Sequence, residues 1–210
     1  MSRGGFFLIS GKPSWWETAK QFLSNDPLLA PLIKKYDGES LLGKGDLFRT
    51  FVNAIVGQQI SVIAADAIWN RLIEKVGSIT PKNIARFTEE EIASCGLTKS
   101  KTSYILGIAK NPDEFLSPNW EEMNDKEIHE HFVGFRGIGP WTAEMLMIFS
   151  LLRPDVFSVG DIGLVKAVKQ LQPGLETKEQ VYNFAERWSP YRTAASWYLW
   201  RMLDPVPVAY

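Results

Sequence analysis

Helix start and stop signals recur along the whole chain, whereas no stretch alternates apolar and polar residues for long enough to predict a sheet strand. At three predicted helix starts Ser or Thr is followed three residues later by Glu or Gln, a pattern in which the two residues cap each other's backbone N–H groups. These places are 14–17, 88–91 and 177–180. The sequence therefore predicts an all-α fold.

The other predicted helices begin at a capping residue, continue along an apolar stripe and end near Gly or Pro. Two short segments, 6–9 and 155–159, are the only candidates for extended structure. The helices are expected to begin at Ser14, Asp46 and Thr177, to span about 61–76, 88–95, 100–110, 124–132, 140–152 and 161–171, and to close with a last helix that has Pro190 in its first turn.

Composition excludes several classes of protein. The single cysteine, Cys95, rules out an internal disulfide and a four-cysteine iron–sulfur cluster, and fits a reducing compartment. The longest apolar stretch, 145–152, follows Glu144 and is too short to cross a bilayer. We therefore expect an intracellular protein with no membrane partner. The net charge of −1 gives no support for a nucleic-acid partner, whereas the eight tryptophans suit a pocket that stacks a flat ring.

A glycine-rich turn at 135–143, FRGIGPWTA, lies between two predicted helices. Gly137 and Gly139 permit a tight reversal, and Pro140 fits the first turn of the next helix. The backbone N–H groups in the segment Ile138 to Trp141, those of Ile138, Gly139 and Trp141, would then form an anion site at a helix N-terminus, which a phosphodiester would fit. From these residues alone, a plain turn between helices is an equally good interpretation.

Asp161 opens the next predicted helix, about twenty residues after the turn. On its position alone, a helix N-cap is the simpler explanation of this aspartate. A catalytic carboxylate is the alternative, and the two roles are separable because asparagine at this position would keep the cap and remove the charge.

Four blocks in order resemble the helix-hairpin-helix DNA glycosylase superfamily and, within it, the 3-methyladenine DNA glycosylase II family. They are AIVGQQIS at 54–61, CGLTKSK at 95–101, the hairpin with its downstream Asp161, and the segment 188–200. Together they extend from about residue 46 to about residue 203. The resemblance implies two helical lobes with a cleft between them. We expect residues 1–45 and 150–210 to form one lobe, and residues 46–149, with the helix-hairpin-helix at about 124–152, to form the other.

The resemblance also implies roles for individual residues. Asp161 matches the family's catalytic aspartate, whereas Trp141 and Trp200 match aromatic pocket walls. Gln58 and Gln59 lie where the family places the loop that fills the gap left by an extruded base.

Two departures from the family pattern are evident. Met145 replaces a pocket tyrosine, so a ring face that would bear on the substrate range is lost. The roughly 45 residues before Asp46 are too few for the β-rich N-terminal domain of larger bacterial members.

The expected DNA contacts come from the hairpin and from nearby basic residues. No cofactor is expected to be required, although the family's hairpins often hold Na⁺ or K⁺ on backbone carbonyls. The hairpin contacts are Gly137, Ile138 and Gly139, the basic residues are Lys99, Lys101 and Arg136, and the carbonyls are those of Val133, Phe135 and Ile138.

The resulting hypothesis is a monofunctional glycosylase that excises alkylated purines from double-stranded DNA and leaves an abasic site. Lyase members of the superfamily carry a Schiff-base lysine two residues after the second hairpin glycine, where this chain has Trp141. We expect a monomer that acts in the cytoplasm of a bacterium or the nucleus of a eukaryote. A helix-hairpin-helix protein that binds DNA without cutting it, a glycosylase for another lesion and a bifunctional lyase are the alternatives.

Overall fold

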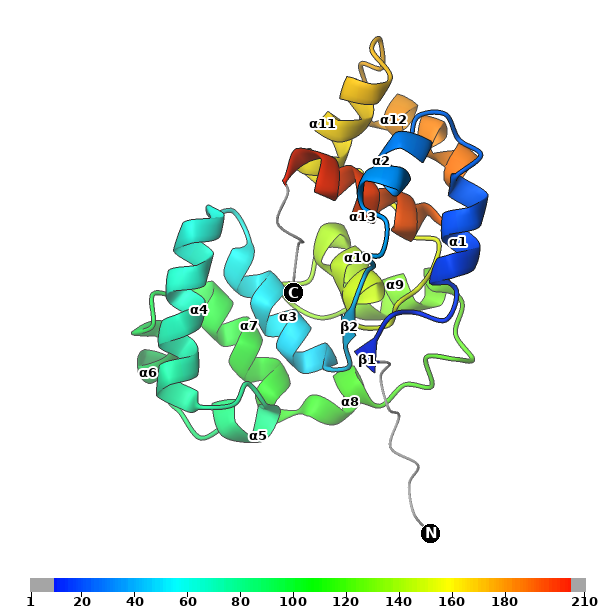
Figure 1. Cartoon of the computed structure of the whole chain (residues 1–210). Helices are drawn as coiled ribbons and strands as arrows, with labels where there is room; N and C mark the ends of the chain where they lie inside the picture. Colours follow the sequence, from blue (N-terminus) through cyan, green and yellow to red (C-terminus); the bar gives the residue numbers. More distant parts are fainter. Residues whose placement is uncertain (1–9, 205–210) are drawn as a thin grey trace. The chain divides into compact units, whose positions relative to one another are not determined.

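The structure, a computed structural model, describes residues 10–204 and divides into two compact units (Figure 1). Of the described residues, Asp46–Leu146 form one unit, and residues 10–45 together with 147–204 form the other. Helices account for nearly all regular structure in this part of the chain, which confirms the all-α prediction. The predicted extended segment at 6–9 lies outside the described residues.

The unit Asp46–Leu146 consists of helices and their connections. Within it, α7 packs against α3, α5, α6 and α8, and α3 packs against α4. The helices are α3 (Leu47–Gly57), α4 (Val62–Val76), α5 (Pro81–Ile84), α6 (Glu89–Ala93), α7 (Lys99–Lys110), α8 (Pro112–Leu116), α9 (Asp125–Val133) and α10 (Pro140–Phe149), of which α10 ends in the other unit.

The second unit is built around α13 (Arg192–Leu203), against which α1, α2 and α11 pack. All nine residues from Thr193 to Arg201 are buried, so this helix is enclosed on every side. The other elements are β1 (Ser10–Gly11), α1 (Trp16–Leu23), α2 (Ala30–Lys35), β2 (Gly43–Lys44), α11 (Ile162–Leu171), α12 (Lys178–Ala185) and the 3₁₀ helix η1 (Glu186–Trp188), and β1 pairs with β2 antiparallel.

Each unit has its own aromatic core. In the first, Phe115 lies with its ring centroid 5.1–5.6 Å from those of Phe51, Phe132 and Phe135. In the second, Trp16 on α1 contacts Trp197 on α13 edge to face at 5.3 Å. Such ring pairs add to the apolar area that each unit buries.

Most predicted helix starts are confirmed, because the caps that produce them are local. Asp46 accepts the N–H of Arg49, and Thr88, Asn124 and Thr177 each form a reciprocal capping box.

The predicted capping box at 14–17 is wrong. Helix α1 begins at Trp16 with Trp15 as its N-cap and no side-chain cap. The carboxylate of Glu17 instead accepts from Lys12 at 2.8 Å, and the indole N–H of Trp15 donates to the carbonyl of Leu152.

Three further predictions in the C-terminal part of the described chain are also wrong. The helix stops at Phe149 rather than at 152, and Leu152 adopts a left-handed φ of 52°. Residues 155–159 form no strand, since the N–H of Val156 donates to the hydroxyl of Thr193. The last helix begins at Arg192, so Pro190 precedes it.

The start of α13 is anchored by Asp155. Its carboxylate accepts Nε and Nη2 of Arg192 at 2.8 and 3.0 Å, the Ser189 hydroxyl at 2.9 Å and the Arg192 backbone N–H at 3.2 Å. Burial by itself would raise the pKa of Asp155, but the hydrogen bonds from Arg192 and Ser189 outweigh it and lower that pKa below its ordinary value. This bidentate pair therefore stabilises the helix that carries the C-terminal part of the site.

We predict that Asp155→Asn lowers the free energy of unfolding by about 1–3 kcal/mol at pH 7, because Arg192 loses a charged partner in a half-buried position. A lowered carboxyl pKa stabilises the fold above the ordinary aspartate pKa of about 4, and this contribution is lost as the pH falls through the native pKa. The difference between wild type and variant should therefore shrink in urea unfolding experiments at about pH 3. The control is Glu186→Gln, which removes an exposed partner of the same arginine and should cost less than about 1 kcal/mol.

Candidate functional site

Asp161 is held at the N-terminus of α11. Its backbone is extended, with φ −81° and ψ 114°, and its Oδ1 accepts the N–H of Leu164 at 2.8 Å. The same oxygen accepts the indole N–H of Trp200 on α13 at 3.2 Å. The side chain is half-buried. Two donors on one oxygen fix both the position and the orientation of this carboxylate.

The surroundings of Asp161 are closely packed. A Cβ built on Gly163 would lie 3.0 Å from Asp161 Oδ1, so the absence of a side chain there leaves room for the carboxylate. Trp200 is 7% exposed and stacks on Phe149 at 5.6 Å between ring centroids. In the described structure Trp200 therefore orients Asp161, and its predicted part as a pocket wall stays a prediction.

The hairpin between α9 and α10 lies in the other unit. Gly137 has a φ of +92°, a conformation that side chains rarely adopt. Its Cα lies against the ring of Tyr104 on α7, where a Cβ would be only 2.2 Å from Cδ2. The N–H of Ile138 donates to the carbonyl of Phe135 at 3.1 Å, so it does not contribute to the predicted anion site. The turn tip at Gly139 and Pro140 is exposed.

The loop after α3 is tied to this hairpin. The side-chain amide of Gln58 donates to the carbonyl of Gly137 at 3.1 Å and to the hydroxyl of Thr142 at 3.0 Å. Gln58 is therefore turned toward the protein. Its neighbour Gln59 is exposed and has a φ of +57°, in the left-handed region.

One of the three predicted phosphate contacts, Lys101, makes its hydrogen bonds within the protein. The ammonium of Lys101 donates to the carbonyls of Val56 and Gln58, at 2.9 and 2.7 Å, and burial lowers its pKa. This lysine therefore points inward.

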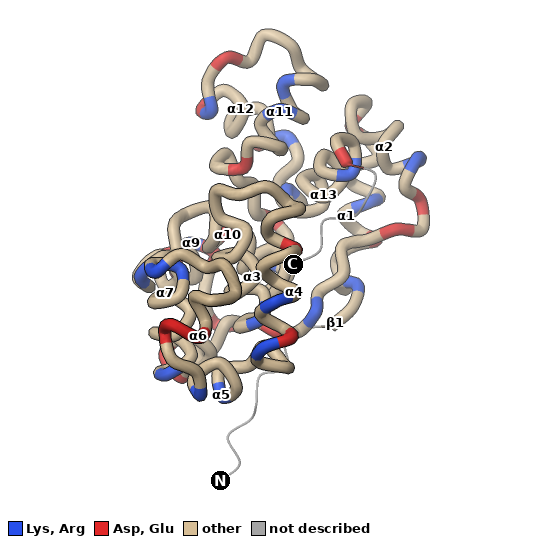
Figure 2. The backbone as a smooth tube through the Cα atoms, turned by 90° about the vertical axis from the view of Figure 1, so that its left-hand side faces the viewer, with Lys and Arg blue, Asp and Glu red and all other residues tan. Residues whose placement is uncertain are grey.

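The other two predicted phosphate contacts, Lys99 and Arg136, are exposed, and the Arg136 guanidinium lies 5.8 Å from the centre of the Tyr104 ring. Figure 2 shows basic segments beside the α7 label, with acidic and basic residues interspersed elsewhere along the chain.

The remaining predicted pocket residues are on α10. Trp141, in its first turn, is half-buried, whereas Met145, one turn later, is completely buried. Both belong to the same unit as the hairpin.

Metal-ligating side chains do not gather anywhere in residues 10–204: no group of three His, Cys, Asp or Glu could hold an ion. The expected cation would instead use backbone oxygens, those of Val133, Phe135 and Ile138. The Phe135 carbonyl already accepts one N–H and retains a second lone pair, so it can still bind a cation. No helix in this part of the chain is long and apolar enough to cross a membrane.

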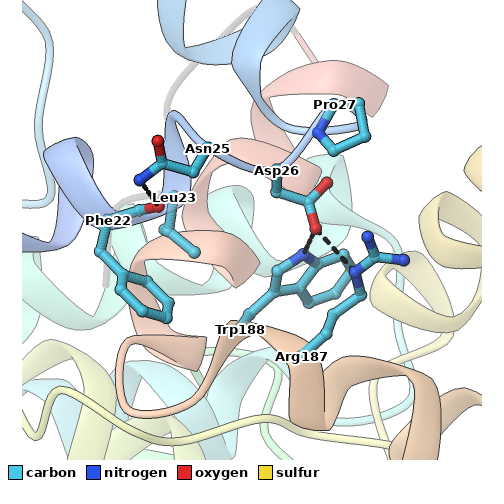
Figure 3. A pocket seen from close by; sticks show the side chains of 7 residues that line it. All are labelled: Phe22, Leu23, Asn25, Asp26, Pro27, Arg187 and Trp188. Carbon is cyan, nitrogen blue, oxygen red and sulfur yellow. Dashed lines mark hydrogen bonds and ion pairs between the residues drawn. The ribbon is translucent and has the colours of Figure 1, made fainter.

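The second unit has a surface pocket of about 240 Å³, and the residues that line it are far from Asp161 in the sequence (Figure 3). Its polar groups are paired with one another, since Asp26 accepts the indole N–H of Trp188 at 3.0 Å and Nε of Arg187 at 2.7 Å. These bonds tie the end of α1 to η1. We therefore assign the pocket a packing role.

Three contributors to the site were missed in the sequence: Gly163, Tyr104 and Thr142. Gly163 carried a usable signal, since it lies two residues after the carboxylate in a helix where glycine is unfavourable. Tyr104 and Thr142 carried none, because their partners are 33 and 84 residues away.

The chain is similar in sequence to known DNA repair proteins. The model of the family described as HhH-GPD superfamily base excision DNA repair protein matches residues 52–190. The chain is 30% identical to a DNA-3-methyladenine glycosylase of Bacillus subtilis over 94% of this chain and 69% of that protein. It is 34% identical to DNA-3-methyladenine glycosylase 1 of Schizosaccharomyces pombe over 82% of this chain and 79% of that protein.

A solved structure has the same fold. The 3-methyladenine DNA glycosylase of Schizosaccharomyces pombe in complex with abasic DNA superposes with a TM-score of 0.77 and 31% identity, covering 92% of this chain and all of that one.

We predict that Gly137→Ala lowers the free energy of unfolding by about 2–5 kcal/mol, since a left-handed backbone and a clash with the Tyr104 ring add together. The matched control is Gly174→Ala, which has a φ of +97° but no atom within 4 Å of the new Cβ and should lose only about 1–2 kcal/mol. Urea unfolding measures both. Equal losses would show that the ring contact does not constrain the hairpin.

Proposed function

Because the chain belongs to the HhH-GPD superfamily of base excision DNA repair proteins, we propose that it is a monofunctional DNA glycosylase of the 3-methyladenine type II class. It excises alkylated purines from double-stranded DNA by hydrolysing the N-glycosidic bond and leaves an abasic site. It acts as a monomer, in the cytoplasm of a bacterium or the nucleus of a eukaryote.

The observation that carries this proposal is the fixed carboxylate of Asp161. Breaking an N-glycosidic bond builds positive charge on the sugar as the base departs, and a preorganised carboxylate stabilises that charge without having to reorient. The donors from Leu164 and Trp200 hold Oδ1 in place, so the side chain does not need to be ordered during the reaction. The same carboxylate can orient the attacking water.

Alkylated purines suit a site with this single carboxylate. A purine alkylated on a ring nitrogen already carries positive charge, so it departs without a strong general acid. A cationic ring is also attracted to aromatic faces, each worth about 0.5–2 kcal/mol depending on desolvation. Trp141 and Trp200 are the aromatic residues proposed for this role, with Met145 in place of a third ring.

Reaching the bond requires the nucleotide to leave the duplex, at a cost of a few kcal/mol. In the proposed complex the hairpin at Gly137–Gly139 grips the strand backbone, and the exposed Gln59 enters the gap. Lys99 and Arg136 contact phosphates. A Na⁺ or K⁺ ion on the hairpin carbonyls would bring positive charge next to a phosphate, and no other cofactor is proposed. The S. pombe relative bound to abasic DNA supports DNA as the partner.

We predict that Asp161→Asn abolishes most base release, by a factor on the order of 10²–10³, because the neutral amide cannot stabilise the charged sugar. Stability should stay within about 1 kcal/mol, since asparagine is an equally good N-cap. Free 3-methyladenine released from methylated DNA measures activity, and thermal unfolding measures stability.

The matched control for this variant is Asp46→Asn, the same substitution at the N-cap of α3, where the carboxylate also accepts a backbone N–H at 2.8 Å. It should leave base release unchanged. Wild-type activity in Asp161→Asn would refute the catalytic role of this aspartate.

We also predict that the native enzyme forms no covalent complex with DNA under borohydride, because Trp141 offers no amine where lyase members have their lysine. Lesion-containing DNA should stay intact after base release until alkali cleaves the abasic site. Trapped protein–DNA adduct on a denaturing gel would contradict the monofunctional assignment.

A further inference from the structure

One face of α7 contacts both segments that are proposed to meet DNA. Lys101 and Tyr104 are three residues apart, so their side chains leave the helix on the same side. Lys101 donates to the loop after α3, and the ring of Tyr104 lies against Gly137 in the hairpin. Helix α7 therefore holds the loop and the hairpin at a set separation.

The contact from Lys101 determines the conformation of the loop tip. The Gln58 carbonyl, which accepts from Lys101 at 2.7 Å, belongs to the peptide plane that leads directly into Gln59. Gln59 has a φ of +57°, which is unfavourable for a residue with a side chain. Fixing the preceding carbonyl therefore holds Gln59 in a conformation that it would otherwise leave.

The loop and the hairpin are also joined directly. The Gln58 amide bridges the Gly137 carbonyl and the hydroxyl of Thr142, which is 2% exposed. Because its backbone accepts from Lys101 while its side chain donates to the hairpin, Gln58 completes a closed set of contacts. Burial lowers the pKa of Lys101, because its ammonium is partly removed from solvent.

We propose that Lys101 is a positioning residue that holds the loop tip at Gln59 in register with the hairpin, and so provides the preference for distorted, lesion-containing DNA over intact duplex. The inference rests on the proposed function, in which both segments meet DNA. It replaces the phosphate contact that the sequence predicts for this lysine.

The test compares the affinity of the full chain for two duplexes, one intact and one with a tetrahydrofuran abasic-site analogue, by fluorescence anisotropy at several KCl concentrations. Lys101→Met should reduce the preference for the analogue about 10- to 100-fold, since small displacements of positioned groups have effects of this size. Its salt dependence should equal that of wild type, because an inward ammonium releases no counterions from DNA. Lys101→Arg, which keeps charge and donors, should restore most of the preference.

Two variants calibrate the result. Lys99→Met removes an exposed lysine from the same helix, and loss of a phosphate contact would reduce the slope of log K against log salt by about 0.9. Thr142→Val removes the second partner of Gln58 without changing shape, and should lower the preference without altering the slope. Thr142→Val also tests the proposal if the Lys101→Met protein does not fold, which circular dichroism would reveal.

Two results would overturn the proposal. Equal loss of affinity for both duplexes, with a slope reduced by about 0.9, would make Lys101 a phosphate contact. A folded Lys101→Met protein with the wild-type preference would make the contact purely structural.

A wild-type protein without DNA affinity would instead contradict the proposed function. Amide hydrogen exchange would then test the positioning role of Lys101. Lys101→Met should accelerate the exchange of backbone amides at 57–61 and 137–141 relative to the rest of the unit. Unchanged exchange there would refute it.

Discussion

The hydrogen bond from the Trp200 indole to Asp161 joins the start of α11 to the last turns of α13, across 39 residues of chain. Its geometry depends on α13 being unable to shift. That helix is buried on all sides, and its first residue, Arg192, is clamped by Asp155. A carboxylate that must stabilise transient charge gains from such rigidity, because reorganisation during the reaction would reduce its effect. In the proposed mechanism the buried helix therefore contributes by keeping the Asp161 carboxylate in place.

The unit with the hairpin is held by a different kind of interaction. The segments of this unit that are proposed to meet DNA are loops, whose exposed backbone offers little apolar area to bury. Their conformations are maintained by polar contacts from Lys101 and Gln58 to backbone carbonyls, and by the Tyr104 ring against Gly137. A buried ammonium is costly unless it is paired, so the two carbonyls stabilise the lysine as much as the lysine stabilises the loop.

Helix starts that depend on neighbouring residues were predicted correctly, whereas contacts between residues far apart in the sequence changed the outcome elsewhere. Asp46, Asn124 and Asp161 cap helices as expected, since the acceptor and the N–H that it binds are three residues apart. The similar pattern at 14–17 formed no capping box, since the indole N–H of Trp15 donates to the distant carbonyl of Leu152 and the Glu17 carboxylate accepts from Lys12. Four short helices, α2, α5, α8 and η1, and the two-residue strands were not predicted, because they span too few residues for any periodicity to be read.

The sequence by itself determined the all-α class, the glycine hairpin and the aspartate that opens α11, because each depends on backbone preferences within a few residues. Only the tertiary structure decided where the polar side chains point. Lys101 looked like a phosphate contact but faces carbonyls at 56 and 58, and Trp200 donates its N–H to Asp161. A long side chain has many rotamers of similar energy, and the partner that selects one of them lies tens of residues away.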